Sequence, residues 1–246
     1  MKAVSEAVIL MAGSGSRLRE SNTTFLKPLV PILGRPLISY TLEMLANIGI
    51  RTVHAVVGFQ KISLIAGLKS LPTADIRFHF IDNPAWEKQN GISLLAAKDH
   101  VTAPFLLTMS DHLFDEAAAE SLLKFADPRE LNLAIDRKLD SIFDLEDGMK
   151  VQTRGDRVIA IGKTLASYDA IDVGLFICPR QIFDYLERAK VNGDCSLADG
   201  VRLMAADNKV RAIDIGDAWW QDVDTPAMLR EAEKKMGSLA APRSGN

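Results

Sequence analysis

A glycine-bearing loop near the start of the chain combines residue types that bind polyphosphate. The apolar run Val8–Met11 leads into Ala12-Gly13-Ser14-Gly15-Ser16, and the cations Arg17 and Lys27 follow. Glycine lets the backbone approach a ligand closely, and the N–H groups of such a loop attract anions. The two cations add the positive charge that a polyphosphate needs. By itself the loop fits two interpretations, a phosphate cradle or an ordinary strand-to-helix turn with two surface cations.

Two common glycine motifs are absent from the sequence. The dinucleotide-binding fingerprint needs a third glycine three residues after Gly15, where Leu18 stands. The P-loop needs its second glycine five residues after the first, followed by Lys and Ser or Thr, and no stretch of the chain has that pattern. If the loop holds phosphate, it does so in another way.

Three aspartates supply oxygen atoms for a metal–triphosphate site. Asp111 follows the apolar run Phe105–Met109, and Asp222 and Asp224 flank Val223. Side chains alternate along an extended segment, so the last two carboxylates would point the same way. Mg²⁺ is usually held by one or two carboxylates together with substrate phosphates. We expect Asp111, Asp222 and Asp224 to hold Mg²⁺; the alternative for each is capping of the following helix.

The composition is that of a soluble, well-packed protein with one large domain or two small ones. The chain has 246 residues, of which 48% are hydrophobic and 25% charged. A net charge of −3 argues against general nucleic-acid binding. Two cysteines and four histidines show no disulfide framework and no metal-ligand spacing. Because no apolar run approaches the roughly 20 residues of a membrane span and no signal-peptide pattern is present, we expect a cytoplasmic protein.

Strands and helices alternate along the first half of the chain. Strands are expected at 6–10, 51–57, 76–81, 105–109 and 131–135, and helices at 36–49, 60–69, 91–100 and 116–125. This order, with continuously apolar strands, predicts a single α/β domain whose mostly parallel central sheet carries helices on both faces. Ligands collect at the carboxyl ends of such strands. The glycine loop, Asn83 and Asp111 are therefore expected along one edge of the sheet.

The pattern changes after Asp136. Short strands at 149–153 and 157–161, joined by a Gly155-Asp156 turn, predict a small antiparallel excursion over residues 136–170. We expect it to lie over the sheet edge, as a lid or as a wall of the acceptor site. Gly174 stands inside the strand expected at 171–178, where glycine often marks a bulge or a close approach. Helices at 180–190 and 196–207, a strand at 210–215 and a helix at 225–236 capped by Thr225 complete the domain. Residues 237–246 have the composition of a disordered tail or linker.

Several motifs together resemble the nucleotidyltransferase superfamily, which activates sugars and alcohols as nucleoside-diphosphate derivatives. Leu10–Leu18, Lys27-Pro28-Leu29 and Gly34–Ile38 resemble its N-terminal signature, and Trp220–Pro226 resembles its C-terminal metal motif. Within the superfamily the chain is most similar to the CTP:inositol-1-phosphate cytidylyltransferases, and next to the related phosphocholine cytidylyltransferases, over residues 6–236. The motifs of this closer resemblance are Glu87–Leu94, Ala97–Asp99, Met109–His112, Ala134–Arg137, Met149–Val151, Ile161–Lys163 and Asp169–Gly174.

The resemblance implies a Rossmann-like (GT-A) nucleotidyltransferase domain over residues 1–236 that transfers CMP from CTP to a small phosphorylated alcohol and releases pyrophosphate. Arg17 would hold the β- and γ-phosphates, and Lys27 would stabilise charge at the α-phosphoryl group. A phosphate monoester is already largely dianionic near neutral pH, so the reaction needs no general base. His112 is expected to orient Asp111.

The resemblance also implies binding residues for both substrates. Those expected at the nucleotide are Leu10, Ala12, Gly13, Ser14, Gly15, Ser16, Gln89, Asn90 and Ser93. The amides of Gln89 and Asn90 match the donor and acceptor edge of cytosine, with a turn position as the alternative for Asn90. At the acceptor, Lys150 and Lys163 would bind the phosphate and Asp136 and Asp172 the hydroxyls. A solvated surface position is the alternative for each lysine.

The acceptor is expected to be inositol 1-phosphate, while a sugar 1-phosphate, phosphocholine and phosphoethanolamine stay open. A choline head group would want an aromatic cage, and the 136–172 segment offers only Phe143 and Tyr168, which favours a polyol. A glycosyltransferase of related fold is disfavoured, because its Asp-x-Asp pair would follow the central strand, where Ser110-Asp111-His112 stands. A regulatory nucleotide-binding subunit would have lost the site residues. Bifunctional members continue into a membrane-embedded transferase. We expect either a stand-alone enzyme, with a separate membrane phosphotransferase acting downstream, or a longer protein of which the linker-like tail marks the cut end.

Overall fold

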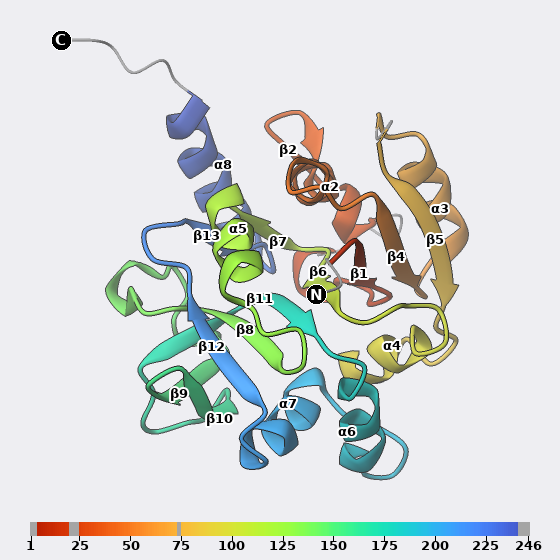
Figure 1. The fold of residues 1–246 in the computed structure, drawn as a ribbon. Coiled ribbons are helices and arrows are strands. Elements are labelled where there is room, and N and C mark those ends of the chain that lie inside the picture. Colours follow the sequence, from red (N-terminus) through yellow and green to blue (C-terminus); the bar gives the residue numbers. More distant parts are fainter. Residues whose placement is uncertain (1–3, 20–24, 73–74, 241–246) are drawn as a thin grey trace, which may run out of the picture.

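The computed structural model describes residues 4–19, 25–72 and 75–240. Within these residues, nine strands form one central sheet in the order β5-β4-β1-β6-β11-β8-β12-β10-β9 (Figure 1). Their bounds are β1 Glu6–Met11, β4 Thr52–Val57, β5 Arg77–Asp82, β6 Phe105–Met109, β8 Leu131–Asp136, β9 Lys150–Arg154, β10 Arg157–Gly162, β11 Ala170–Cys178 and β12 Val210–Asp214. The strands β5, β4, β1 and β6 are parallel, as are β8 and β12, and β11 joins these two groups in antiparallel orientation.

Helices cover both faces of this sheet, as the alternation of strands and helices predicts. Their bounds are α1 Ser16–Arg19, α2 Leu37–Asn47, α3 Lys61–Lys69, α4 Asn90–Ala96, α5 Glu116–Phe125, α6 Ile182–Ala189, α7 Leu197–Ala206 and α8 Pro226–Ala240. Along β1, Val8 belongs to the core beneath α4, α6 and α7, and Ile9 to the core beneath α2, α3 and α5. Successive side chains of a strand point to opposite faces, and both faces here are covered, so the strand is apolar throughout.

Two short ribbons complete the fold. One pairs β2 (Pro31–Ile32) with β3 (Arg35–Pro36), and the other pairs β7 (His112–Phe114) with β13 (Trp220–Asp222). The β7–β13 ribbon joins segments more than one hundred residues apart in the sequence and packs against a third core that includes Leu113 and Val223. The ribbon begins one residue after Asp111, so its pairing brings the Trp220–Asp222 strand close to that aspartate.

Two expectations about the second half of the chain are corrected. The strands β9 and β10 pair with β11 and β12, so the antiparallel excursion extends the central sheet instead of lying over its edge. The helix α8 continues to Ala240, so the prediction of a disordered tail is wrong for Gly237–Ala240, while residues 241–246 lie outside the described part. The capping prediction for Thr225 is confirmed, since the Met228 N–H donates to Thr225 Oγ1 at 3.3 Å.

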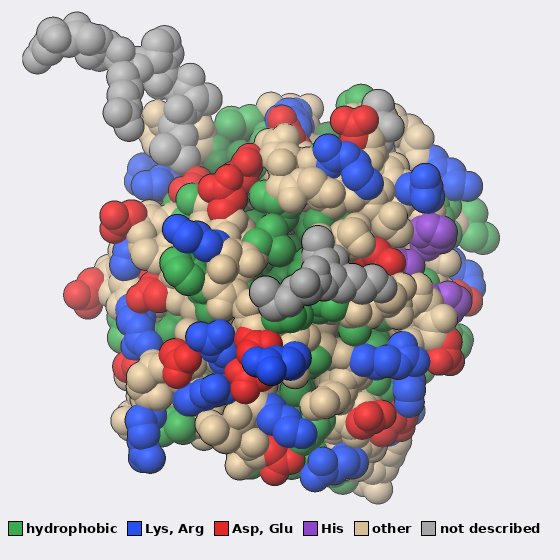
Figure 2. Space-filling view, in the orientation of Figure 1, with side chains coloured by type: hydrophobic (Ala, Val, Ile, Leu, Met, Phe, Trp, Pro, Cys, Tyr) green, Lys and Arg blue, Asp and Glu red, His purple; other side chains and the backbone are tan. Residues whose placement is uncertain are grey.

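On the face that Figure 2 shows, lysine and arginine side chains are interspersed with aspartate and glutamate, so this face has no large patch of one charge. Among the described residues, no helix is both long and apolar enough to cross a bilayer.

Candidate active site

Two adjoining cavities lie at the carboxyl ends of β1 and β6, with volumes of 340 and 260 Å³. They share Leu10, Gly13, Asp111 and Asp224, so they form one continuous cleft. The smaller, phosphate-side cavity is also lined by the glycine loop, Arg17 and Lys27. The larger one extends toward β9 and β11. The sheet edge inferred from the strand order is therefore the edge at which these residues meet.

The glycine loop is shaped around Lys27. Gly15 adopts φ +60°, and a Cβ at this position would lie 2.7 Å from Lys27 Cβ, closer than side chains approach. The Leu18 N–H donates to the Gly15 carbonyl at 3.2 Å and starts the short helix α1, whose Leu18 side chain is buried. Gly15 thus serves both the left-handed turn and the approach of the lysine.

Lys27 is the buried cation of the site. Its side chain is 8% exposed, and Nζ lies 2.6 Å from Asp111 Oδ2 and also contacts Asp224 Oδ1. Burial would lower the pKa of Lys27, but the two carboxylates raise it above its ordinary value. Burial would likewise raise the pKa of Asp111, yet Lys27 and His112 hold it well below its usual range. The lysine is therefore a fixed positive charge and Asp111 a fixed negative one.

The β7–β13 ribbon brings the C-terminal motif to Asp111. Asp222 lies opposite His112 in the ladder, and the Val223 N–H donates to the Asp111 carbonyl at 2.9 Å. The capping alternative is wrong for Asp111, because α5 begins after Asp115. Asp222 and Asp224 do not cap the helix α8 either, because the capping residue is Thr225, which follows them. Two distant segments thus converge on one edge as the chemistry requires.

His112 orients Asp111, as expected. Its Nδ1 lies 2.7 Å from Asp111 Oδ1, and its ring stacks on Trp220 with 6.2 Å between centroids. Burial would lower the pKa of His112, but Asp111 raises it above its ordinary value. Gly174 in β11 faces this ring, and a Cβ there would lie 2.6 Å from it. The glycine inside the strand therefore marks a close approach by a side chain.

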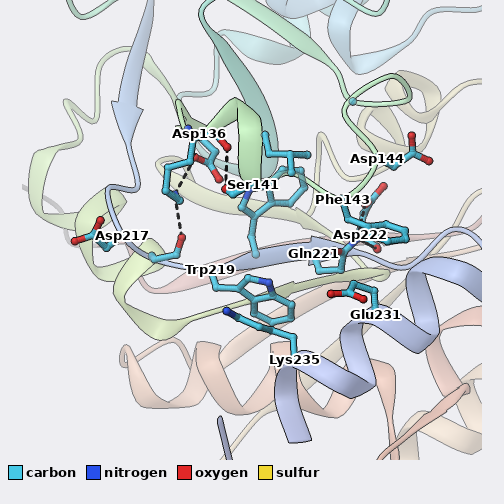
Figure 3. A pocket seen from close by; sticks show the side chains of 15 residues that line it. Asp136, Ser141, Phe143, Asp144, Asp217, Trp219, Gln221, Asp222, Glu231 and Lys235 are labelled. Atoms are coloured by element: carbon cyan, nitrogen blue, oxygen red, sulfur yellow. Dashed lines mark hydrogen bonds and ion pairs between the residues drawn. The ribbon is translucent and has the colours of Figure 1, made fainter. Parts of the chain in front are cut away.

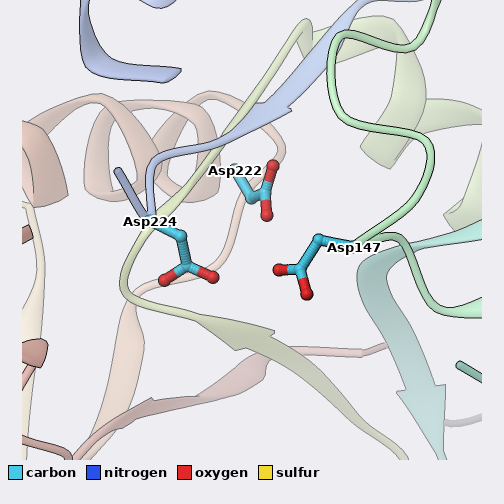
Figure 4. Close-up of side chains that lie close together, drawn as sticks. All are labelled: Asp147, Asp222 and Asp224. Atoms are coloured by element: carbon cyan, nitrogen blue, oxygen red, sulfur yellow. The ribbon is translucent and has the colours of Figure 1, made fainter. Parts of the chain in front are cut away.

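Three carboxylates point toward one another in the cleft, those of Asp147, Asp222 and Asp224 (Figure 4). One oxygen from each lies within 4.8 Å of the others. Burial raises the pKa of Asp222, as expected for a carboxylate that needs a cation beside it. Three hard oxygen donors on one side of a phosphate cavity suit a divalent ion such as Mg²⁺. Asp111 is not part of this group, because both of its oxygens contact Lys27 and His112.

Asp147 is a charged residue of the cleft that the sequence did not single out. It lies in the loop before β9, and its carboxylate bridges two cations: Arg17 Nη1 at 2.7 Å and Lys163 Nζ at 2.6 Å. Burial would raise the pKa of Asp147, but these two cations lower it below its ordinary value. Arg17 also contacts Asp224. The only sequence signal was the density of acidic residues between 140 and 147, which does not single out one of them.

The nucleotide residues divide into those that line the cleft and those that do not. The lining residues are Leu10, Ala12, Gly13, Gly15, Ser16, Asn90 and Ser93. Among the described residues, Ser14 and Gln89 do not line it, and the Gln89 N–H donates to Asp194. Asn90 Oδ1 accepts from the Leu197 N–H at 2.8 Å, which uses part of its capacity to accept, while its amide nitrogen can donate to a base. Trp86 and Lys88 line the cleft and were not predicted.

Two of the four acceptor residues lie where the sequence analysis expects them. Lys163 and Asp172 line the larger cavity. Burial raises the pKa of Asp172 to about 6, against the lowering effect of the Gly174 N–H, which donates to it at 2.7 Å. Lys150 is not among the described residues that line this cavity, and its role at the acceptor phosphate stays a prediction. Its Nζ donates to the Glu146 carbonyl at 2.9 Å and its neighbour Met149 takes the cleft position, because adjacent residues of an extended chain point opposite ways.

Asp136 lines a separate, neighbouring cavity of 350 Å³, and its contact with the acceptor's hydroxyls stays a prediction. It is buried, lies 2.8 Å from Lys138 Nζ, and accepts from Trp220 Nε1 at 2.9 Å. These contacts give Asp136 a structural role in holding the ribbon.

The neighbouring cavity has an aromatic and acidic lining. Phe143, Trp219 and Trp220 contribute rings, and Asp144 and Glu231 contribute carboxylates (Figure 3). The 136–172 segment contains few aromatic residues, but the fold brings Trp219 and Trp220 from a distant segment of the chain into the same cavity. It adjoins the cleft through Gly148, Trp220 and Asp222.

Comparison with known proteins agrees with this geometry. Residues 7–193 match the family described as MobA-like NTP transferase domain. The chain belongs to this nucleotidyltransferase family. It is 32% identical over 241 residues to the bifunctional IPC transferase and DIPP synthase of Rubrobacter xylanophilus, covering 98% of this chain and 53% of that protein. The protein of the same name from Thermococcus kodakarensis is 32% identical over 243 residues, covering 98% and 52%.

A solved structure resembles this nucleotidyltransferase over its full length. The inositol-1-phosphate CTP transferase from T. maritima superposes with a TM-score of 0.84 and 25% identity, covering 99% of each chain. The fold prediction is therefore confirmed. The chain spans about half the length of the curated relatives it matches.

Proposed function

We propose that this nucleotidyltransferase transfers CMP from CTP to inositol 1-phosphate, giving CDP-inositol and pyrophosphate. The observation that carries the proposal is the buried Lys27, held between Asp111 and Asp224 beside the glycine loop. This arrangement supports the proposal, because a fixed cation and carboxylates that suit a metal ion lie at one phosphate-sized cavity. The choice of CTP and inositol 1-phosphate is supported by the substrates named for the similar T. maritima transferase.

In the proposed reaction, an oxygen of the acceptor phosphate attacks the α-phosphorus of CTP in line. A new oxygen–phosphorus bond forms, and the bond between the α-phosphorus and its bridging oxygen breaks, so that pyrophosphate leaves with the electron pair. Lys27 stabilises charge at the α-phosphoryl group, and Arg17 binds the outer phosphates. Positioning and charge neutralisation supply the catalysis, since the dianionic acceptor phosphate is already a nucleophile.

Mg²⁺ fits the acidic side of the cleft. Asp222 and Asp224 would hold it, and Asp111, the third expected ligand, would first have to exchange its contact with Lys27 or His112. When bound, the ion neutralises the charge of the triphosphate. The Asp222 carboxylate lies in a partly buried position beside Asp224 and Asp111, and their charges raise its pKa further beyond the effect of burial. A divalent cation would relieve that repulsion.

The acceptor would lie in the larger cavity, with its phosphate toward Lys163 and its hydroxyls toward Asp172. The cytosine would lie against Trp86 and the amide nitrogen of Asn90, which line the same cavity.

The test is a substrate matrix. The purified chain with Mg²⁺ is given each of the four NTPs against inositol 1-phosphate, glucose 1-phosphate, phosphocholine and phosphoethanolamine, and pyrophosphate release is measured. We expect kcat/KM to be at least about tenfold higher for CTP with inositol 1-phosphate than for any other pair. A higher value for another acceptor would reassign the substrate but keep the reaction class.

The aromatic and acidic cavity supports a second candidate, a cationic acceptor such as phosphocholine. Aromatic faces and carboxylates together attract quaternary ammonium groups. Of the two lysines in that lining, Lys138 is neutralised by Asp136, so the acidic groups prevail. The phosphocholine arm of the matrix decides between the two candidates.

A further inference from the structure

We propose that Asp147 is an internal substitute for substrate phosphate, a clasp that both substrates displace and that couples their binding. The inference rests on the proposed function, because it assigns Arg17 to the triphosphate and Lys163 to the acceptor. Asp147 is then a positioning residue whose carboxylate holds both cations while the substrates are absent.

The contacts of Asp147 place it between the two halves of the cleft. Arg17 comes from the helix after the glycine loop and lines the phosphate-side cavity, whereas Lys163 follows β10 and lines the larger cavity. Asp147 Oδ2 lies 2.7 Å from Arg17 Nη1, and Oδ1 lies 2.6 Å from Lys163 Nζ. One carboxylate thus joins the helix after the glycine loop to a residue 146 positions after Arg17 in the chain.

Competition follows from the charges. A triphosphate offers Arg17 more negative charge than one carboxylate does, and a dianionic acceptor phosphate offers Lys163 more as well. Each substrate must therefore take its cation from Asp147. The bridges are partly exposed, with 53% of the Arg17 side chain and 50% of the Lys163 side chain accessible, so each one contributes modestly.

Coupling follows from the sharing of one carboxylate. When the triphosphate takes Arg17, Asp147 loses one of the two contacts that fix its position, and it is left facing Asp222 and Asp224. Its hold on Lys163 then weakens, and the acceptor binds more tightly. By linkage, the acceptor must strengthen CTP binding by the same factor.

The experiment compares the wild-type chain with Asp147→Asn in calorimetric titrations. The ligands are inositol 1-phosphate and CTP carrying a methylene group in place of the α–β bridging oxygen, each alone and together, with Mg²⁺ present. We expect each ligand alone to bind about three- to tenfold more tightly to the variant. We expect the analogue to tighten inositol 1-phosphate binding by about three- to tenfold in the wild type and by less than twofold in the variant.

The matched control is Asp140→Asn, an exposed aspartate of the same loop segment, which should behave as the wild type. If Asp147→Asn binds the CTP analogue no more tightly than the wild type, the clasp is wrong, whatever the acceptor is. If it instead needs about tenfold more Mg²⁺ to bind the analogue, Asp147 is a metal ligand and the clasp is also wrong. Wild-type turnover of CTP with inositol 1-phosphate is measured separately, so failure of the proposed acceptor is distinguished from failure of the clasp.

Discussion

Gly174 and His112 lie so close that only a hydrogen atom on the glycine Cα fits between them. The ideal Cβ of any other residue would lie 2.6 Å from two atoms of the imidazole ring. The same glycine has φ +75°, in the left-handed region. Because His112 in turn fixes Asp111 through its Nδ1, the shape of β11 determines where a catalytic-cleft carboxylate lies.

Gly174→Ala should therefore lower both stability and activity. We expect a loss of at least about 2 kcal/mol in the free energy of unfolding, from the clash and the left-handed backbone together. We also expect kcat to fall at least about tenfold because the imidazole must move. Urea unfolding and pyrophosphate release measure the two effects. Gly155→Ala is the control, with φ +62° but no atom within 4 Å of its Cβ, so it carries only the backbone cost. Equal losses in both variants would contradict the role of the ring.

Lys27→Ala and Asp111→Ala should each reduce turnover at least about 1,000-fold, because each removes a fixed charge beside the transferred phosphoryl group. Lys27 is nearly buried, so its loss leaves two carboxylates without their cation, and we expect unfolding to become easier by about 3 kcal/mol. Circular dichroism checks that the variants fold, and Lys69→Ala, on the exposed side of α3, is the control. Near-normal turnover of Asp111→Ala at saturating Mg²⁺ would show that this carboxylate is not needed.

Lys163→Ala and Lys150→Ala test which of the two lysines expected at the acceptor phosphate binds it. Only Lys163 lines the cleft, whereas Lys150 donates to backbone carbonyls of its own loop. We expect Lys163→Ala to raise the KM of inositol 1-phosphate about tenfold and Lys150→Ala to change it less than twofold. Initial rates at saturating CTP measure both. The opposite order would restore Lys150 as the acceptor residue.

Asp172→Asn should make the protein more stable, but only at the higher pH values. Burial raises the pKa of Asp172 from 3.8 to about 6, so between these values the folded state binds the proton more tightly than the unfolded state does. Stability from this group is complete below about pH 4 and is lost as the pH rises to about 6. The asparagine does not titrate. We expect the variant to gain about 1 to 3 kcal/mol at pH 7.5 and nothing at pH 4, measured by urea unfolding at both values; a gain of equal size at both would refute the titration.

The sequence predicts the sheet and most of the phosphate side of the cleft, because each rests on local signals. Buried strands such as β6 read as continuous apolar runs, and a carboxylate directly after one of them, as at Asp111, falls at the ligand edge. Gly15 could be identified as a loop residue, although its approach to Lys27 could not, since twelve residues separate them.

Several residues on the acceptor side of the cleft could not be predicted from the sequence, because they come together only in three dimensions. A shift of one residue along an extended segment decides that Met149 and not Lys150 faces the cleft. Asp147 acquires its role only where Arg17 and Lys163 meet it, and the β7–β13 ribbon is three residues long, too short for any periodic pattern. The aromatic cavity likewise combines Phe143 with tryptophans some 75 residues later, which no window of sequence contains.

The last helix, α8, extends from the segment that carries Asp222 and Asp224. It begins at Pro226, two residues after Asp224, and its fifteen residues run without a break to Ala240. At 1.5 Å per residue, the whole helix is about 22 Å long, and Figure 1 shows it rising away from the sheet. Ala232 of this helix is buried in the third core, and Leu229 and Met236 pack against that core. The helix therefore fastens the segment that carries Asp222 and Asp224 to the body of the domain over more than one turn.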